Sequence, residues 1–261
     1  MILQKIIQNK RLQLTTDQQE LSIEKMEERL DKLAPLPLRS FREALLTSKD
    51  IAIIGEIKKA SPSRGVFRAD FDPLELARLY QCSGVQALSV LTERKFFQGK
   101  DQYLTVVRQN SSLSILRKDF IIDPWQIYQS RLLGADALLL IVSILSLPEL
   151  IDYYRLAKNL GLDCLVEVHN QQELAMALEA DVEIIGINNR DLKNFSISLQ
   201  TTEKLIQHIP AGKIVISASG INSSKDLQYL RNLGVNGLLI GEALMRAGDL
   251  KKMVRSLRGE G

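Results

Sequence analysis

The chain has 261 residues, of which 45% are hydrophobic and 25% are charged, and its formal net charge is +3. A chain of this length buries enough surface for one large core. The near balance of charge gives no case for nucleic acid or a membrane surface as a partner, and the longest apolar run, at 137–142, is too short to span a bilayer.

Residues 1 to about 48 form a polar segment that we expect to be helical. Its apolar residues recur with a loose helical period: they are Ile6, Ile7, Leu12, Leu21, Met26 and Leu30. Pro35 and Pro37 interrupt this pattern, and a second short helix is expected around 41–46.

From residue 51 onward, short apolar segments alternate with amphipathic helical segments. The expected strands are 51–57, 87–91, 114–117, 137–142, 163–168, 183–187, 213–217 and 237–240. Helical patterns between them include 73–82, 124–133, 147–160, 172–178 and 224–233.

Eight strands, each followed by helical sequence, predict an α/β fold, a (β/α)8 TIM barrel with an N-terminal helical extension. The strands are almost continuously apolar, as parallel strands covered on both faces should be. A doubly wound open sheet is the alternative. Its dinucleotide-binding version is disfavoured because no G-x-G-x-x-G turn follows the first strand. We therefore expect residues 1–261 to form one domain, in which 1–48 is a helical arm that caps the barrel.

The first strand ends in a charged pair, Glu56 and Lys58, just before the turn at Ser61 and Pro62. Side chains two residues apart lie on one face of a strand, so the carboxylate and the ammonium should point the same way. The C-terminal end of a buried parallel strand is where α/β proteins place their chemistry. This end of the strand is therefore a candidate active site.

Other strands end in polar residues too, among them Lys118, Glu167, Asn188 and Arg190. In a barrel these ends meet on one rim. Each residue taken singly could belong to a structural ion pair. The whole set of matched acids and bases favours a catalytic site, because unpaired buried charge is costly and a merely structural rim would not need so many.

The last two strands end in small residues, Ser219 with Gly220 and then Gly241. Backbone N–H groups at the start of a helix bind phosphate, and barrels often place such a site after strands 7 and 8. Taken alone, these residues read as ordinary turn glycines. Their place in the order of the barrel favours a phosphate site.

The strand ends resemble the indole-3-glycerol phosphate synthase family over nearly the whole chain. The motifs are E-I-K-K-A-S-P-S at 56–63, L-T-E at 91–93, R-K-D-F at 117–120, V-E-V at 166–168, G-I-N-N-R-D-L at 186–192, S-G-I at 219–221 and L-I-G-E-A-L-M at 239–245. The resemblance implies a lyase of tryptophan biosynthesis. It would convert 1-(2-carboxyphenylamino)-1-deoxyribulose 5-phosphate to indole-3-glycerol phosphate, with loss of CO₂ and water and without a cofactor or metal.

The resemblance also implies catalytic roles. Lys118 would be the general acid at ring closure, and Glu167 a general base in the later steps. Lys58 would bind the carboxylate or phosphate region and donate the proton for loss of water. Glu56 would orient or neutralise the lysines, and Asn188 would hold a reacting hydroxyl or the catalytic carboxylate. Free lysine has a pKa of about 10.4, which we expect desolvation or neighbouring cations to lower toward working pH.

The implied substrate contacts fall into two groups. The anthranilate ring would lie in an apolar pocket, beside Ser61, formed by Pro62, Phe97, Phe120, Leu139 and Leu192. Arg190 would face the substrate carboxylate or support the rim. The phosphate would be held by Ser219, Gly220, Gly241 and Glu242, the last through its backbone N–H with its side chain turned away from the anion.

Two other functions are alternatives to this one. Another phosphate-binding barrel enzyme, similar to phosphoribosylanthranilate isomerase, would use a Cys/Asp pair at strand ends, which this rim lacks. A non-catalytic barrel would be expected to have lost Lys118 or Glu167, and both are present.

The two cysteines have neither disulfide nor metal-ligand spacing. Together with an N-terminus unlike a signal peptide, they predict a cytoplasmic protein. We expect its partner to be a small phosphorylated substrate rather than nucleic acid or a membrane, and we expect it to be a monomer.

Overall fold

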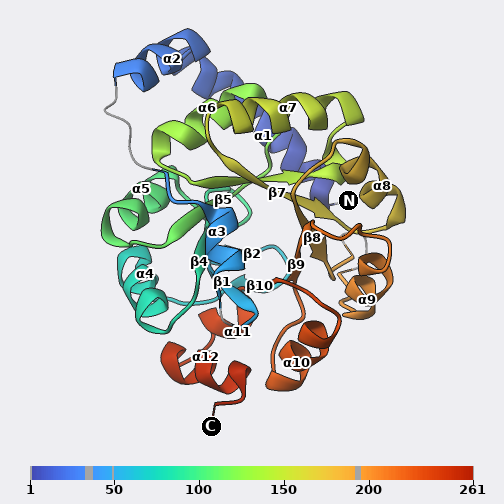
Figure 1. Cartoon of the computed structure of the whole chain (residues 1–261). Helices are drawn as coiled ribbons and strands as arrows, with labels where there is room; N and C mark the ends of the chain where they lie inside the picture. Colours follow the sequence, from blue (N-terminus) through green and yellow to red (C-terminus); the bar gives the residue numbers. More distant parts are fainter. Residues whose placement is uncertain (1, 33–37, 49, 192–194, 261) are drawn as a thin grey trace.

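Eight parallel strands close into a barrel in the computed structural model, which describes residues 2–32, 38–48, 50–191 and 195–260 (Figure 1). The strands are β1 (Ala52–Ile57), β4 (Ala87–Leu91), β5 (Ser114–Lys118), β6 (Ala137–Ile141), β7 (Asp163–Val168), β8 (Ile184–Asn188), β9 (Ile214–Ala218) and β10 (Gly237–Ile240). Each pairs with the next, and β10 pairs with β1 to close the ring. The predicted (β/α)8 barrel is confirmed.

Helices surround the strands (Figure 1). They are α4 (Pro73–Cys82), α5 (Asp101–Asn110), α6 (Pro124–Leu133), α7 (Leu147–Asn159), α8 (Gln171–Glu179), α9 (Gln200–Ile206), α10 (Ser224–Asn232), α11 (Glu242–Met245) and α12 (Leu250–Arg258), with a 3₁₀ turn η1 (Val142–Ile144). The expected helices at 73–82 and 124–133 match α4 and α6 at both ends. An aspartate caps the start of each one, and proline occupies its first turn. The small hairpin β2 (Ala60–Ser61) and β3 (Gly65–Val66) was not predicted.

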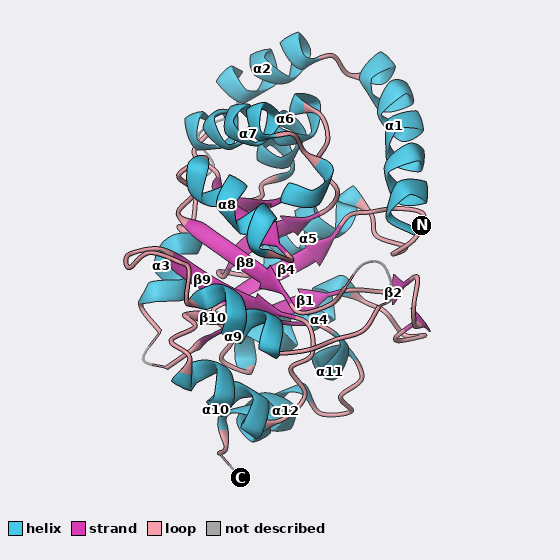
Figure 2. Ribbon diagram, turned by 90° about the vertical axis from the view of Figure 1, so that its right-hand side faces the viewer, coloured by secondary structure: helices cyan, strands magenta, loops and turns pink. Residues whose placement is uncertain are grey.

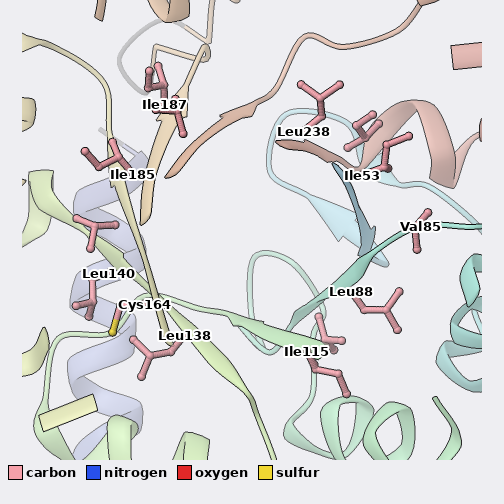
Figure 3. Packing of buried hydrophobic residues seen from close by; sticks show 14 of the residues in the cluster. Ile53, Val85, Leu88, Ile115, Leu138, Leu140, Cys164, Ile185, Ile187 and Leu238 are labelled. Atoms are coloured by element: carbon pink, nitrogen blue, oxygen red, sulfur yellow. The ribbon is translucent and has the colours of Figure 1, made fainter. Parts of the chain in front are cut away.

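The core has two layers, because side chains alternate along each strand. The outer layer lies between strands and helices and contains Ile53, Leu88 and Leu138, among others (Figure 3). The inner layer fills the barrel and contains Ala52 and Ile54 from β1. Continuing that alternation turns Glu56 inward at the end of the strand.

The N-terminal arm is divided between the two ends of the barrel. It comprises α1 (Ile2–Glu20), α2 (Ile23–Lys32) and α3 (Phe41–Leu46), and Figure 2 shows α1 and α3 at opposite ends. Phe41 and Leu45 of α3 are buried in the inner layer, where they close the N-terminal end of the strands. The predicted arm is thus helical, but only part of it lies at the mouth that carries the charged residues.

The buried face of α1 differs from the expected one. It consists of Ile6, Lys10 and Leu14, whereas Leu12 is 68% exposed. Of the helices that the structure describes, none has the length and apolar character needed to cross a bilayer.

Candidate active site

Five polar side chains meet at the C-terminal end of the barrel around a cavity of about 260 Å³. They are Glu56, Lys58, Lys118, Glu167 and Asn188. The residues belong to β1, β5, β7 and β8 or, for Lys58, follow directly after β1. Each occupies an inward-facing position of the strand alternation, which brings groups that are distant in sequence onto one rim.

Glu56 is the centre of this cluster. Its carboxylate binds Lys58 Nζ through Oε2, and Oε1 lies 3.5 Å from Lys118 Nζ. Burial opposes ionisation of Glu56, but the two ammonium groups outweigh it and hold its pKa below the usual range. Glu56 is therefore a buried carboxylate that fixes two lysines at once.

Lys118 lies between two carboxylates, because its Nζ is also 3.9 Å from Glu167 Oε2. Burial favours the neutral amine, yet Glu56 and Glu167 outweigh this effect and raise the pKa of Lys118 above that of free lysine. The expected lowering of this pKa is therefore wrong. Lys118 is held there as a charged ammonium, the form that can donate a proton.

Glu167 is held from two sides. Asn188 Nδ2 donates a hydrogen bond of 3.1 Å to Glu167 Oε1, and His169 Nε2 lies 3.5 Å from the same oxygen. His169 Nδ1 is 2.9 Å from Glu173 Oε2. Burial opposes protonation of His169, but the two carboxylates outweigh it and raise its pKa. The sequence assigned His169 no role, although it lies behind Glu167 in this network.

The apolar side of the cavity is formed around Phe97 and Phe120, whose ring centroids are 6.1 Å apart. The loop that carries Phe97 is held by the buried Glu93, whose carboxylate accepts the backbone N–H groups of residues 95, 96 and 97. Pro62 and Leu139 also line this side. A flat aromatic ring fits such a surface.

Helix α1 completes the apolar wall with Ile2, Leu3 and Ile6. Sequence reasoning did not assign these residues to the site. Their spacing along one helical face was the available signal, but a helical period does not say which element the face packs against.

Another part of the cavity wall is formed by the turn that follows β9. Ser219 and Gly220 both have positive φ angles, of 70° and 86°. Asn189 holds this turn, because its Nδ2 donates to Ser217 Oγ and to the carbonyl oxygens of Ala218 and Ser219. Ser219 and Gly220, in the turn after β9, both line the cavity.

Glu242 follows Gly241 at the start of α11, and three arginines surround its side chain. Its carboxylate lies 3.3 Å from Arg64 Nε, 3.3 Å from Arg246 Nε and 4.0 Å from Arg190 Nη2. Glu242 also lines the cavity.

All predicted site residues that the structure describes line this one cavity: Glu56, Lys58, Ser61, Pro62, Phe97, Lys118, Phe120, Leu139, Glu167, Asn188, Arg190, Ser219, Gly220, Gly241 and Glu242. Leu192 lies outside the described residues. Besides the residues of α1, the lining residues that sequence reasoning missed include Arg64, Phe67 and Asp119. Asp119 stands inside the R-K-D-F motif, so its position was the signal.

A sequence profile described as "Indole-3-glycerol phosphate synthase" matches residues 3–257. The chain belongs to the indole-3-glycerol phosphate synthase family. The resemblance seen in the strand-end motifs is confirmed. The chain is accordingly a carboxy-lyase of tryptophan biosynthesis, and the isomerase-like and non-catalytic alternatives are set aside.

Relatives of the family match over almost their whole length. The chain is 50% identical to the indole-3-glycerol phosphate synthase of Acetivibrio thermocellus, over 99% of both chains. It is 45% identical to that of Thermoanaerobacter pseudethanolicus over 100% of both. It is 46% identical to that of Clostridium acetobutylicum, over 96% of this chain and 95% of the relative.

Solved structures with much lower identity share the fold alone. The 3-hexulose-6-phosphate synthase of Salmonella typhimurium matches with a TM-score of 0.63 and 14% identity, over 80% of this chain and 97% of that one. The thiamine phosphate pyrophosphorylase of Pyrococcus furiosus matches with a TM-score of 0.62 and 15% identity, over 80% and 94%.

Proposed function

We propose that Lys118 is the general acid that drives ring closure of 1-(2-carboxyphenylamino)-1-deoxyribulose 5-phosphate in this cavity. The observation that carries the proposal is the position of its ammonium, 3.5 Å from Glu56 and 3.9 Å from Glu167 and next to the apolar ring pocket. Two carboxylates keep the proton on Lys118 until a substrate oxygen approaches.

Ring closure needs a proton on the ketone oxygen. The aromatic carbon that bears the carboxylate attacks the ketone carbon, and the carbonyl electron pair moves to oxygen, where Lys118 delivers its proton. Loss of CO₂ then returns the C–C bonding electrons to the ring and restores its aromaticity. Phe97, Phe120 and Leu139 supply the apolar surface against which the ring would lie during both steps.

The last step removes water from the new five-membered ring. A base takes a proton from the ring CH₂, and an acid protonates the departing hydroxyl. We assign the base to Glu167, which Asn188 holds with a 3.1 Å hydrogen bond. Asn188 therefore acts as the group that fixes the catalytic carboxylate.

We assign the acid of this dehydration to Lys58. Its ammonium is bound by Glu56 and lies near Gly241, where a β-carbon at position 241 would be 2.9 Å from it. Lys58 thus lies beside Gly241, one of the residues to which we assign the phosphate. Glu56 serves both lysines by orienting and neutralising them.

The remaining contacts complete the substrate model. Ser219, Gly220 and Gly241 would meet the phosphate through their main chain, with Glu242 contributing its backbone N–H, and Ser61 and Pro62 would border the substrate from the β1 side. Arg190 would face the anthranilate carboxylate, and its backbone N–H donates to Asn188 Oδ1 at 3.1 Å.

We also propose that the protein acts as a cytoplasmic monomer. Cys82 and Cys164 are both free thiols, as suits a reducing compartment. Light scattering coupled to gel filtration tests the monomer; a dimer mass at micromolar concentration would contradict it.

The direct test is an indole-fluorescence assay with the carboxyphenylamino-deoxyribulose phosphate and no added metal. We expect a rising signal from the wild-type protein and almost none from Lys118→Ala. Near-normal turnover by Lys118→Ala would remove Lys118 from the role of acid. No turnover by the wild type, with a substrate analogue still binding, would overturn the proposed reaction.

A further inference from the structure

The face of α1 that packs on the barrel has a charge at its centre. Its buried residues are Ile6, Lys10 and Leu14, one turn apart. Lys10 Nζ lies 2.8 Å from Asp119 Oδ1, and the two side chains are only 2% and 1% exposed. Burying an ion pair strips water from both charges, and apolar residues of similar size often stabilise a protein better. Stability alone is a weak reason for this pair.

Asp119 joins α1 to the barrel through several contacts. Its Oδ1 accepts the backbone N–H of Phe120 at 2.8 Å in addition to Lys10. Its Oδ2 accepts the Thr92 hydroxyl at 2.7 Å and lies 3.5 Å from Arg117 Nη2. Burial opposes ionisation of Asp119, but Lys10 and Arg117 outweigh it and lower its pKa. Lys10 is the one contact in this set that comes from outside the barrel.

Asp119 separates two residues of the proposed site. Lys118 precedes it and Phe120 follows it, and all three line the cavity. A change in the position of Asp119 therefore moves the backbone of both neighbours. Lys118 Nζ is 3.5 Å from Glu56 and 3.9 Å from Glu167, so a small displacement would alter its place between the two carboxylates.

We propose that Lys10 is a positioning residue for catalysis: by binding Asp119 it sets the backbone that carries Lys118, so that the acid is in place only when α1 covers the mouth of the barrel. The inference rests on the proposed role of Lys118. Docking of α1 would then have two effects. Ile2, Leu3 and Ile6 cover the cavity, and Lys10 aligns the proton donor through Asp119.

Other contacts keep the arm attached when Lys10 is changed. Asp17 Oδ1 lies 3.2 Å from Arg94 Nη1 in a pair whose arginine is 43% exposed. Trp125 Nε1 donates a 2.6 Å hydrogen bond to the carbonyl of Leu21, and Trp125 packs with Leu14 and Met26. The arm can therefore stay docked without the Lys10–Asp119 pair. A change at Lys10 can thus test the positioning of Lys118 separately from the docking of the arm.

The experiment compares Lys10→Met, Asp119→Asn and the double variant with the wild type, using the fluorescence assay for kcat and KM at 25 °C. Asp17→Asn is the matched control, because it removes an ion pair between arm and barrel that does not touch Asp119. Trp125 is the only tryptophan of the chain, so the emission maximum of each free protein reports whether the arm is docked.

We expect Lys10→Met to lower kcat by about 10- to 100-fold, because a misplacement of about 1 Å has effects of this order, while the Trp125 emission maximum stays unchanged. Asp17→Asn should keep its kcat within about twofold. The double variant should lose little more than either single one, because both changes remove the same contact.

Several results would overturn the inference. One is a wild-type kcat in Lys10→Met with a lower melting temperature, which makes the pair purely structural. Another is a fall in kcat accompanied by a red shift of the Trp125 emission maximum, which would mean that the arm has left the barrel and that this loss of docking lowers kcat. If Lys10→Met does not fold, the double variant takes its place, because it leaves neither Lys10 nor Asp119 as an unpaired buried charge. A wild-type kcat in the double variant then overturns the inference. Turnover by the wild type separates all of these from a failure of the proposed function.

Discussion

Gly241 of the β10 end lies directly against the carboxylate of Glu56. A β-carbon at position 241 would overlap Glu56 Oε2 and would lie 2.9 Å from Lys58 Nζ. The close approach follows from the pairing of β1 with β10, in which Gly55 is opposite Ile240. A glycine thus makes room for the ion pair at the centre of the site.

Gly241→Ala is therefore expected to displace the Glu56 carboxylate and lower kcat/KM by about 100-fold, since the proton donor and its partner would be misplaced by ångström distances. The fluorescence assay measures the change. Gly248→Ala is the matched control, because a β-carbon there would meet nothing within 4 Å. Equal activity of the two variants would contradict the role given to this contact.

Lys118→Ala is expected to lower kcat by about 10²- to 10⁴-fold, the usual contribution of a positioned general acid. Its side chain is 17% exposed and stands at the mouth rather than in the core, so the melting temperature should change little. Lys95→Ala removes an exposed lysine from the same end of the barrel and should keep wild-type kcat. A kcat in Lys118→Ala close to that of Lys95→Ala would exclude Lys118 as the acid.

Glu56→Gln should move the alkaline limb of the kcat/KM profile to lower pH. Lys118 must be protonated to act, and the negative charge of Glu56 is one cause of its raised pKa. Removing that charge lowers the pKa, so the active ammonium is lost at a lower pH. An alkaline limb that stays in place, or moves upward, would mean that a group other than Lys118 controls it.

His169→Gln should change how stability depends on pH. The folded protein raises the pKa of His169 through Glu173 and Glu167, after the opposing effect of burial. Its pairing therefore stabilises the fold fully below the unfolded pKa of about 6.5 and is lost as pH rises through the higher folded value. The Tm difference between wild type and variant should shrink over that rise.

The matched control for this titration is His208→Gln, which removes the only other histidine, an exposed one. Because its side chain is exposed, this substitution should leave the Tm close to that of the wild type. A constant Tm gap for His169→Gln across the same range would show that the imidazole contributes packing but no ion pair.

Ile6→Ala and Phe41→Ala should separate the two ends of the arm. Ile6 lines the cavity, so its truncation should raise KM several-fold as the ring pocket loses apolar surface. Phe41 is fully buried at the other end, so its truncation should cost about 3–5 kcal/mol of stability with KM unchanged. The checks are steady-state kinetics and chemical denaturation. A raised KM in Phe41→Ala would contradict this division.

The sequence by itself determined the barrel fold and which polar residues end its strands at the C-terminal rim. Side-chain direction alternates along a strand, which is a local property, so the spacing alone places Glu56 and Lys58 on the same face. The expected and observed strands agree closely for the same reason, as β4, β7 and β10 illustrate.

Only the tertiary structure decided which distant groups share one space. The direction in which the pKa of Lys118 shifts depends on the balance between burial and two carboxylates from β1 and β7. No local sequence pattern gives that balance. The division of the arm between the two ends of the barrel, and the pairing of Lys10 with Asp119, depend likewise on packing across more than a hundred residues of sequence. A helical period shows that α1 has a buried face, but the surface that buries it is a property of the folded chain.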